Sequence, residues 1–172
     1  MTTHFVMMGV CGCGKTTAAL FLQKHLNQCP YAEGDDFHTQ ANRDKMGAGI
    51  PLTDEDRYPW LCNLRDWMTE QAQSGAAYTI VTCSALKRQY RDILRGAQGK
   101  TAFIHLTPPQ AINLERMMAR QGHYMKAGML DSQLEILEEL GADEYGVKID
   151  NPGSPEAVEA DILAWVKAEG LL

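Results

Sequence analysis

One stretch near the N-terminus constrains the fold of this chain more than any other: Gly9-Val10-Cys11-Gly12-Cys13-Gly14-Lys15-Thr16. It fits G-x-x-x-x-G-K-[ST], the phosphate-binding P-loop, whose backbone N–H groups surround a polyphosphate. Apolar residues 5–8 precede the loop, and an amphipathic stretch over 17–26 follows it. A P-loop between a buried strand and a helix predicts a doubly wound α/β fold with a nucleotide at the carboxyl end of its first strand.

The fixed positions of the loop predict how it holds a nucleotide. Lys15 is expected to reach the β- and γ-phosphates, and the Thr16 hydroxyl to ligate Mg²⁺. The helix that begins near Lys15 points its positive end at the same anion. We therefore predict ATP and Mg²⁺ as cofactors. The residues expected to bind them in this part of the chain are Gly9, Val10, Cys11, Gly12, Cys13, Gly14, Lys15, Thr16 and Thr17.

Strand and helix signals alternate along the chain, as in a parallel sheet of about five strands covered on both faces. Strands are expected over 4–8, 31–33, 78–83, 100–106 and 146–149. Helices are expected over 17–26, 88–94, from 108, over 131–140 and over 155–168. Residues 38–75 predict two helices and no strand, the second helix capped by Thr53 or Asp54. We interpret 38–75 as an insertion over the active-site edge of a single domain, 1–172.

Charge and composition argue against several classes of function. The chain carries 16 Lys and Arg against 22 Asp and Glu, whereas a nucleic-acid surface needs a basic face. No apolar run is long enough to cross a bilayer, and the N-terminus enters the first strand without a signal peptide. We therefore expect a cytoplasmic protein that binds neither nucleic acid nor membrane. The five cysteines, an odd number, argue against a disulfide framework, and no second pair gives Cys11 and Cys13 zinc spacing.

Acidic residues follow the second strand, at the sheet edge where doubly wound folds bind their ligands. Asp35 is well placed to accept the proton of a substrate hydroxyl and to hold its oxygen in line with the γ-phosphate. Asp36 is the second candidate, and a turn or cap role for Asp35 stays open. An acidic group at this position can also support Mg²⁺ through water.

Cationic residues near the same edge are candidate ligands for an anionic substrate. Arg57, in the insertion, suits bidentate binding of a carboxylate or phosphate. Lys87 and Arg91 are four residues apart and are expected to share a helix face and to meet the same ligand. A solvated surface charge stays the alternative for each of them.

A connection over 120–131 has the composition of a mobile lid. Arg116 and Arg120 lie beside it at helical spacing. An arginine carried by a closing lid can stabilise negative charge on a transferring phosphoryl group. Surface arginines are the alternative here too.

Marks of other P-loop classes are missing from the sequence. Residues 44–47 match D-x-x-G but fall in a predicted helix, no Asn-Lys-x-Asp occurs, and no strand ends in a Walker B pattern. These observations favour a small-molecule or nucleotide kinase over a GTPase or a motor ATPase. A nucleotide-binding regulator without catalysis is disfavoured by intact Lys15, Thr16 and Asp35.

Several further blocks extend the pattern over nearly the whole chain: residues 8–16, 33–38, 42 with 45–46, 49–57 with 59–61, 83–87 with 90–91, 120–125, and 130 with 133–135. Together they resemble the gluconokinases, which belong to the shikimate-kinase-like P-loop kinases. The P-loop is shared by many families. The blocks Asp-Arg-x-Pro-Trp-Leu at 56–61 and Cys-Ser-Ala-Leu-Lys at 83–87 are far more specific.

The resemblance implies a fold and an activity. The fold is a five-stranded parallel sheet in the order 2-3-1-4-5, with a lid near 120–130, commonly in a homodimer. The activity is ATP-dependent phosphorylation of D-gluconate at its terminal hydroxyl. A kinase of shikimate or of a nucleoside monophosphate stays the alternative.

The resemblance also implies roles for individual residues. Lys15, Asp35 and Arg120 become the catalytic candidates, and Arg116 is expected near the adenine. Cysteine stands at 11 and 13, where the family often has serine, which raises the question of redox sensitivity. The residues expected to bind gluconate are Asp35, His38, Lys45, Arg57, Lys87, Arg91 and His123.

Overall fold

A computed structural model describes residues 1–108, 127–150 and 153–172 of the chain. Its strands form one parallel sheet in the order β2-β3-β1-β4-β5, which confirms the expected strand order. The strands are β1 Thr3–Met8, β2 Tyr31–Glu33, β3 Tyr78–Thr82, β4 Lys100–Leu106 and β5 Gly146–Ile149. The helices in the described part are α1 Lys15–His25, the 3₁₀ helix η1 Gly34–Phe37, α2 Gln40–Gly47, α3 Asp54–Gln73, α4 Arg88–Arg95, α6 Ala127–Ile136 and α7 Pro155–Ala168.

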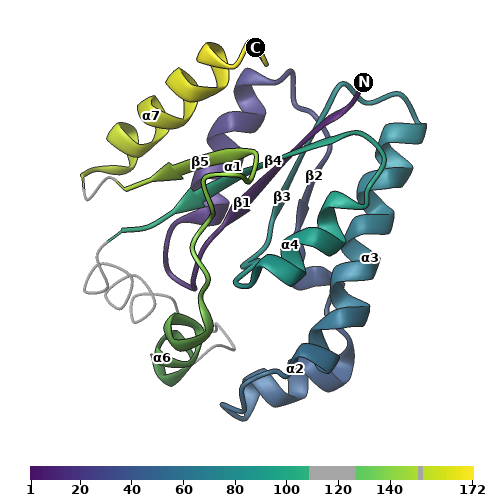
Figure 1. Cartoon of the computed structure of the whole chain (residues 1–172), viewed down its shortest axis with the longest axis vertical. Coiled ribbons are helices and arrows are strands. Elements are labelled where there is room, and N and C mark those ends of the chain that lie inside the picture. The colour runs from purple at the N-terminus through teal and green to yellow at the C-terminus, as the bar shows by residue number, and fades with distance from the viewer. Residues whose placement is uncertain (109–126, 151–152) are drawn as a thin grey trace.

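The central strand β1 is buried on both sides, and its side chains alternate between two hydrophobic clusters. Phe5 and Met7 pack with residues of α1 and α7 on one face of the sheet. Val6 and Met8 pack with residues of α3 and α4 on the other. Figure 1 shows these two helical layers on either side of the sheet. Continuous burial explains why residues 5–8 of β1 form an unbroken apolar run.

The segment 38–75 has two structural parts. The side chains of Trp60, Leu64 and Met68 in α3 are almost completely buried against the sheet. The shorter helix α2 lies at the N-terminal end of α3, away from the sheet (Figure 1). A capping box fixes the start of α3: the Thr53 hydroxyl accepts from the Asp56 N–H, and the Asp56 carboxylate accepts from the Thr53 N–H.

Two local expectations differ from the structure. Residues 34–37 form a 3₁₀ turn that the sequence analysis does not predict. The helix expected over 131–140 is α6, which ends at Ile136. It ends early because the backbone beyond it bonds to other elements. The Glu138 N–H donates to the Leu86 carbonyl, and the Glu138 and Glu139 carbonyls accept from the Arg91 guanidinium.

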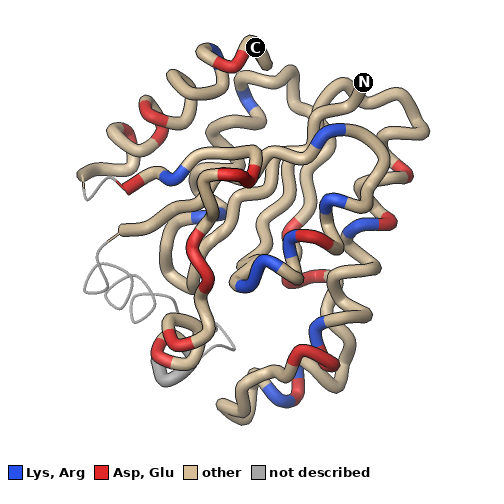
Figure 2. The backbone as a smooth tube through the Cα atoms, in the orientation of Figure 1, with Lys and Arg blue, Asp and Glu red and all other residues tan. Residues whose placement is uncertain are grey.

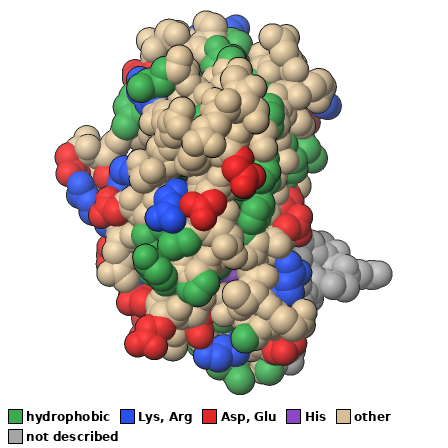
Figure 3. Space-filling model, turned by 90° about the vertical axis from the view of Figure 1, so that its right-hand side faces the viewer, with side chains coloured by type: hydrophobic (Ala, Val, Ile, Leu, Met, Phe, Trp, Pro, Cys, Tyr) green, Lys and Arg blue, Asp and Glu red, His purple; other side chains and the backbone are tan. Residues whose placement is uncertain are grey.

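Charge is spread over the chain. Basic and acidic residues are interspersed along the described backbone (Figure 2). The face shown in Figure 3 mixes both signs with hydrophobic side chains. Among the described residues, no helix is both long and apolar enough to cross a bilayer.

Candidate active site

The P-loop joins β1 to α1 in a conformation that depends on glycine. Gly9 has a φ of 146°, and a Cβ atom there would lie 2.7 Å from the Leu106 carbonyl oxygen. Gly14 is the N-cap of α1 and adopts the left-handed region, with a φ of 96°, which other residues rarely adopt. These two positions let the loop turn tightly and present its N–H groups at the N-terminus of α1.

A cleft of about 480 Å³ opens over this loop. That volume lies in the range of small-ligand sites. The Lys15 ammonium crosses the loop and donates to the Gly9 and Val10 carbonyls at 3.0 and 3.1 Å. The residues lining the cleft are Cys11, Gly12, Gly14, Lys15, Thr16, Thr17, Glu33, Asp35, Asp36, Thr82, Cys83, Ser84 and Gln133.

Glu33 is a site residue to which sequence reasoning gives no role. The Thr16 hydroxyl donates to its Oε1 at 2.7 Å, and the Thr82 hydroxyl donates to its Oε2 at 2.6 Å. Tyr31 also donates to Oε1. Burial alone would raise the pKa of Glu33, but the hydrogen bonds from Thr82, Tyr31 and Thr16, with the charge of Lys15, lower it below its usual value.

The residues around Thr16 fit Mg²⁺. A hydroxyl and an ionised carboxylate lie side by side, and both are hard oxygen donors. Mg²⁺ usually takes only one or two carboxylates and completes its shell with water and phosphate oxygens. Among the described residues there is no cluster of three or more His, Cys, Asp or Glu side chains that could hold a metal alone. The signal that could have identified Glu33 is its place at the end of β2, beside the P-loop.

Asp35 lies in η1 at the carboxyl end of the sheet and faces the cleft with its neighbour Asp36. Its side chain is 43% exposed, which leaves it accessible to a ligand. His38 lies behind Asp35, with its Nε2 atom 3.8 Å from Asp35 Oδ1. The His38 ring is buried and stacks on Trp60, with ring centroids 4.0 Å apart.

A second cavity, of about 390 Å³, lies between the start of α3 and α6. Arg57 and Lys87 contribute its cations. The Arg57 guanidinium donates to the Leu52 carbonyl at 2.8 Å and to the Tyr90 hydroxyl at 3.1 Å. Gln133 lines both this cavity and the cleft over the P-loop. The two cavities therefore adjoin at Gln133.

Lys45 is placed differently from Arg57 and Lys87. It pairs with Asp56 at 2.8 Å and lies outside the lining of both cavities. Asp56 is also half of the capping box of α3, so this ion pair joins α2 to the start of α3.

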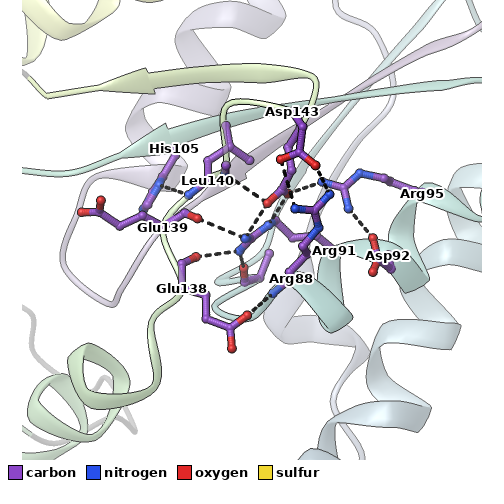
Figure 4. A network of polar contacts seen from close by, with 12 residues as sticks. Arg88, Arg91, Asp92, Arg95, His105, Glu138, Glu139, Leu140 and Asp143 are labelled. Atoms are coloured by element: carbon purple, nitrogen blue, oxygen red, sulfur yellow. Dashed lines mark hydrogen bonds and ion pairs between the residues drawn. The ribbon is translucent and has the colours of Figure 1, made fainter.

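Contrary to the prediction of the sequence analysis, Arg91 does not lie at a ligand-binding surface. Its side chain is fully buried and pairs with Glu144, at 2.6 Å from Nε and 2.9 Å from Nη2. It also donates to the carbonyls of Ala85, Glu138 and Glu139 (Figure 4). All of these acceptors are internal, so Arg91 has no donor directed at either cavity.

The prediction that Lys87 and Arg91 share a helix face is wrong for a local reason. Helix α4 begins at Arg88, and Lys87 is its N-cap with an extended backbone (φ −111°, ψ 149°). The Lys87 carbonyl accepts from the Arg91 N–H at 3.2 Å, but the extended backbone at Lys87 gives its side chain a different direction. Lys87 turns toward Asp54 at 3.0 Å and the second cavity, while Arg91 turns into the core.

Three expected site residues, Arg116, Arg120 and His123, lie outside the described residues, as does most of the expected lid over 120–131. Cys11 and Cys13 are described. Both side chains are buried at the P-loop, and neither forms a disulfide.

A strand–P-loop–helix unit, carboxylates at the end of β2 and the strand order 2-3-1-4-5 together define a P-loop kinase. No family model matches the chain. The gluconokinase of Gluconobacter oxydans is 42% identical over 164 residues, covering 95% of this chain and 91% of that protein. The chain belongs to the gluconokinase family.

Two solved structures agree with this assignment. A sugar kinase from Janibacter superposes with a TM-score of 0.90 at 46% identity, covering 97% of this chain and 95% of that one. A gluconokinase from Sinorhizobium meliloti superposes with a TM-score of 0.82 at 36% identity, covering 96% and 92%.

Proposed function

We propose that this protein is a gluconokinase, which transfers the γ-phosphoryl group of ATP to the terminal hydroxyl of D-gluconate. The products are 6-phospho-D-gluconate and ADP. The observation that carries the proposal is the pair of adjoining cavities, one over the P-loop and one lined by Arg57 and Lys87. Family membership supplies the identity of the acceptor.

On the donor side, the N–H groups of the P-loop and the Lys15 ammonium bind the β- and γ-phosphates of ATP. The Thr16 hydroxyl and the Glu33 carboxylate would hold Mg²⁺. The cation supplies charge neutralisation for the phosphates when it is bound. Glu33 also fixes the position of the Thr16 hydroxyl, since its Oε1 atom accepts a hydrogen bond from that hydroxyl at an O–O distance of 2.7 Å.

On the acceptor side, Asp35 accepts the proton of the terminal hydroxyl of gluconate. The hydroxyl oxygen forms a bond to the γ-phosphorus while the bond from that phosphorus to the β,γ-bridging oxygen breaks. The electron pair of the broken bond leaves with ADP, and the proton on Asp35 passes to solvent. Arg57 and Lys87 bind the gluconate carboxylate in the second cavity.

The proposal includes groups outside the described residues. Arg120, carried by a lid over 120–131, stabilises the charge of the transferring phosphoryl group. Arg116 lies near the adenine, and His123 contacts gluconate. The chain forms one domain, 1–172, with 38–75 as its substrate-binding insertion.

The proposed setting is the cytoplasm, in agreement with the use of ATP and with five cysteines of which none forms a disulfide. The proposed assembly is a homodimer, which follows from the family resemblance. Sedimentation of the purified protein tests the dimer directly.

A coupled assay for ADP release is the experiment that tests the function. We expect activity with gluconate, and loss of that activity when EDTA removes the divalent cation. Shikimate and nucleoside monophosphates are the comparison acceptors. Activity confined to one of them would overturn the proposal.

Arg57→Ala is expected to raise the KM for gluconate by about 10- to 100-fold, the size of a lost charged hydrogen bond. The KM for ATP should stay near the wild-type value, because Arg57 lies outside the lining of the cleft over the P-loop. Steady-state kinetics with each substrate varied separately gives both constants. Arg65→Ala, on the same helix and paired with Asp66, is the matched control. Equal increases in both constants would refute the assignment of Arg57 to gluconate.

A further inference from the structure

His38 is held tightly beside the proposed catalytic carboxylate. It follows η1 directly, its side chain is 3% exposed, and its ring lies nearly parallel to that of Trp60, at an angle of 18°. Stacking fixes the plane of the imidazole. The direction of its hydrogen bonds then depends on which ring nitrogen carries the proton.

Asn42 determines that tautomer. Its Nδ2 atom donates to the Asp56 backbone carbonyl at 2.8 Å, and a carbonyl can only accept, so this atom is the amide nitrogen. The same NH₂ group lies 3.2 Å from His38 Nδ1. Because the Asn42 NH₂ group can only donate, His38 Nδ1 must accept the hydrogen bond and therefore carries no proton. The proton of a neutral His38 is therefore on Nε2, the atom 3.8 Å from Asp35 Oδ1.

The surroundings also keep the ring neutral. Burial, followed by the charges of Arg43 on α2 and Arg57 on α3, lowers the pKa of His38 to about 3. At neutral pH the imidazole thus has one N–H group, and it faces the Asp35 carboxylate.

We propose that His38 is a positioning residue whose Nε2–H donates to Oδ1 of Asp35 in the substrate complex, leaving Oδ2 free to accept the gluconate proton. This inference rests on the proposed function. The separation of 3.8 Å is too long for a hydrogen bond, and catalytic hydrogen bonds commonly shorten when substrate binds. A half-exposed carboxylate needs such a partner, because a misplacement of about 1 Å can cost about 10²-fold in rate.

The tautomer is tested without any activity measurement. Long-range ¹H–¹⁵N NMR spectra of the labelled protein distinguish the Nε2–H form, the Nδ1–H form and the imidazolium ion. We expect the Nε2–H form of His38 throughout the neutral pH range. The Nδ1–H form or the imidazolium ion would overturn the inference, even if the protein phosphorylates gluconate as proposed.

The positioning role is tested with two variants of His38. His38→Phe keeps the stacked ring and removes the donor, so kcat should fall by about 10²-fold with little change in the KM for gluconate. His38→Gln restores an N–H donor near the Nε2 position and should recover most of that loss. His25→Phe, on the exposed surface of α1, is the control, and thermal unfolding of each variant shows whether the fold is intact.

Other outcomes are equally informative. A raised KM for gluconate with unchanged kcat would make His38 a substrate ligand, as the family resemblance implies, and would overturn the positioning role. An unchanged kcat in His38→Phe would reduce His38 to a packing role, because that variant keeps the stacked ring and lacks the donor. Equal losses in His38→Phe and His38→Gln would also overturn the donor role. Absence of gluconate phosphorylation in the wild-type protein would instead refute the proposed function, while the NMR result would stand.

Discussion

Replacing Asp35 with asparagine is expected to lower the rate of phosphoryl transfer by about 10²- to 10⁴-fold, the usual contribution of a positioned proton acceptor. An amide has the shape of the carboxylate but cannot take the hydroxyl proton. The affinity for ATP should stay near the wild-type value, because the P-loop contacts are untouched. Single-turnover kinetics measures the rate of phosphoryl transfer. Calorimetric titration with a non-hydrolysable ATP analogue measures the nucleotide affinity.

Asp36→Asn is the matched control, since Asp36 is the adjacent carboxylate and lines the same cleft. We expect it to retain most of the activity. If Asp36→Asn loses the activity and Asp35→Asn keeps it, the proton acceptor is Asp36, the second candidate of the sequence analysis.

Replacing Arg91 with methionine is expected to lower the free energy of unfolding by about 3 to 5 kcal/mol, as when a buried ion pair loses one partner. The variant leaves Glu144 buried, with 1% of its side chain exposed. Three backbone carbonyls also lose their donor. Urea unfolding followed by circular dichroism measures the change, and the KM for gluconate of the folded variant should be nearly unchanged.

The effect of Arg91→Met depends on pH with a definite sign. Burial alone would raise the pKa of Glu144, but its bonds to Arg91, the Gly141 N–H and Arg95 lower it to about 2 from an ordinary 4.5. The ionised carboxylate therefore stabilises the fold above about pH 4.5, and this contribution is lost as the pH falls toward 2. The stability difference between wild type and variant should narrow over that interval.

Arg88→Met tests whether any arginine of α4 would give the same result. Arg88 pairs with Asp143 at the surface, so its loss should change stability little. If Arg91→Met left stability unchanged and raised the KM for gluconate, the ligand role that the sequence predicts for Arg91 would be restored.

The sequence predicts the sheet because its strands are buried on both faces and flanked by clear turn signals. The bounds of β2, β4, β5 and α7 agree with the prediction. These elements are set by local hydrophobicity and by proline and glycine, which a single sequence displays directly.

The environment of Arg91 could not be predicted in the same way. Its main partner, Glu144, lies 53 residues further along the chain. No periodic pattern links such distant positions. The position of α6 depends on the same contacts, because Arg91 binds the carbonyls that follow that helix. Long-range polar contacts thus account for both the burial of Arg91 and the early end of α6, neither of which the sequence analysis predicts.

Glu33 connects the active site to an edge strand of the sheet. Strand β2 has only three residues and, among the described strands, pairs with β3 alone. The carboxylate at its end accepts from Thr16 at the start of α1 and from Thr82 at the end of β3. The Glu33 side chain therefore anchors a short edge strand and orients the Thr16 hydroxyl, which is proposed to bind Mg²⁺. Folding and metal binding impose the same requirement on position 33, an ionised carboxylate that can accept several hydroxyl groups at once.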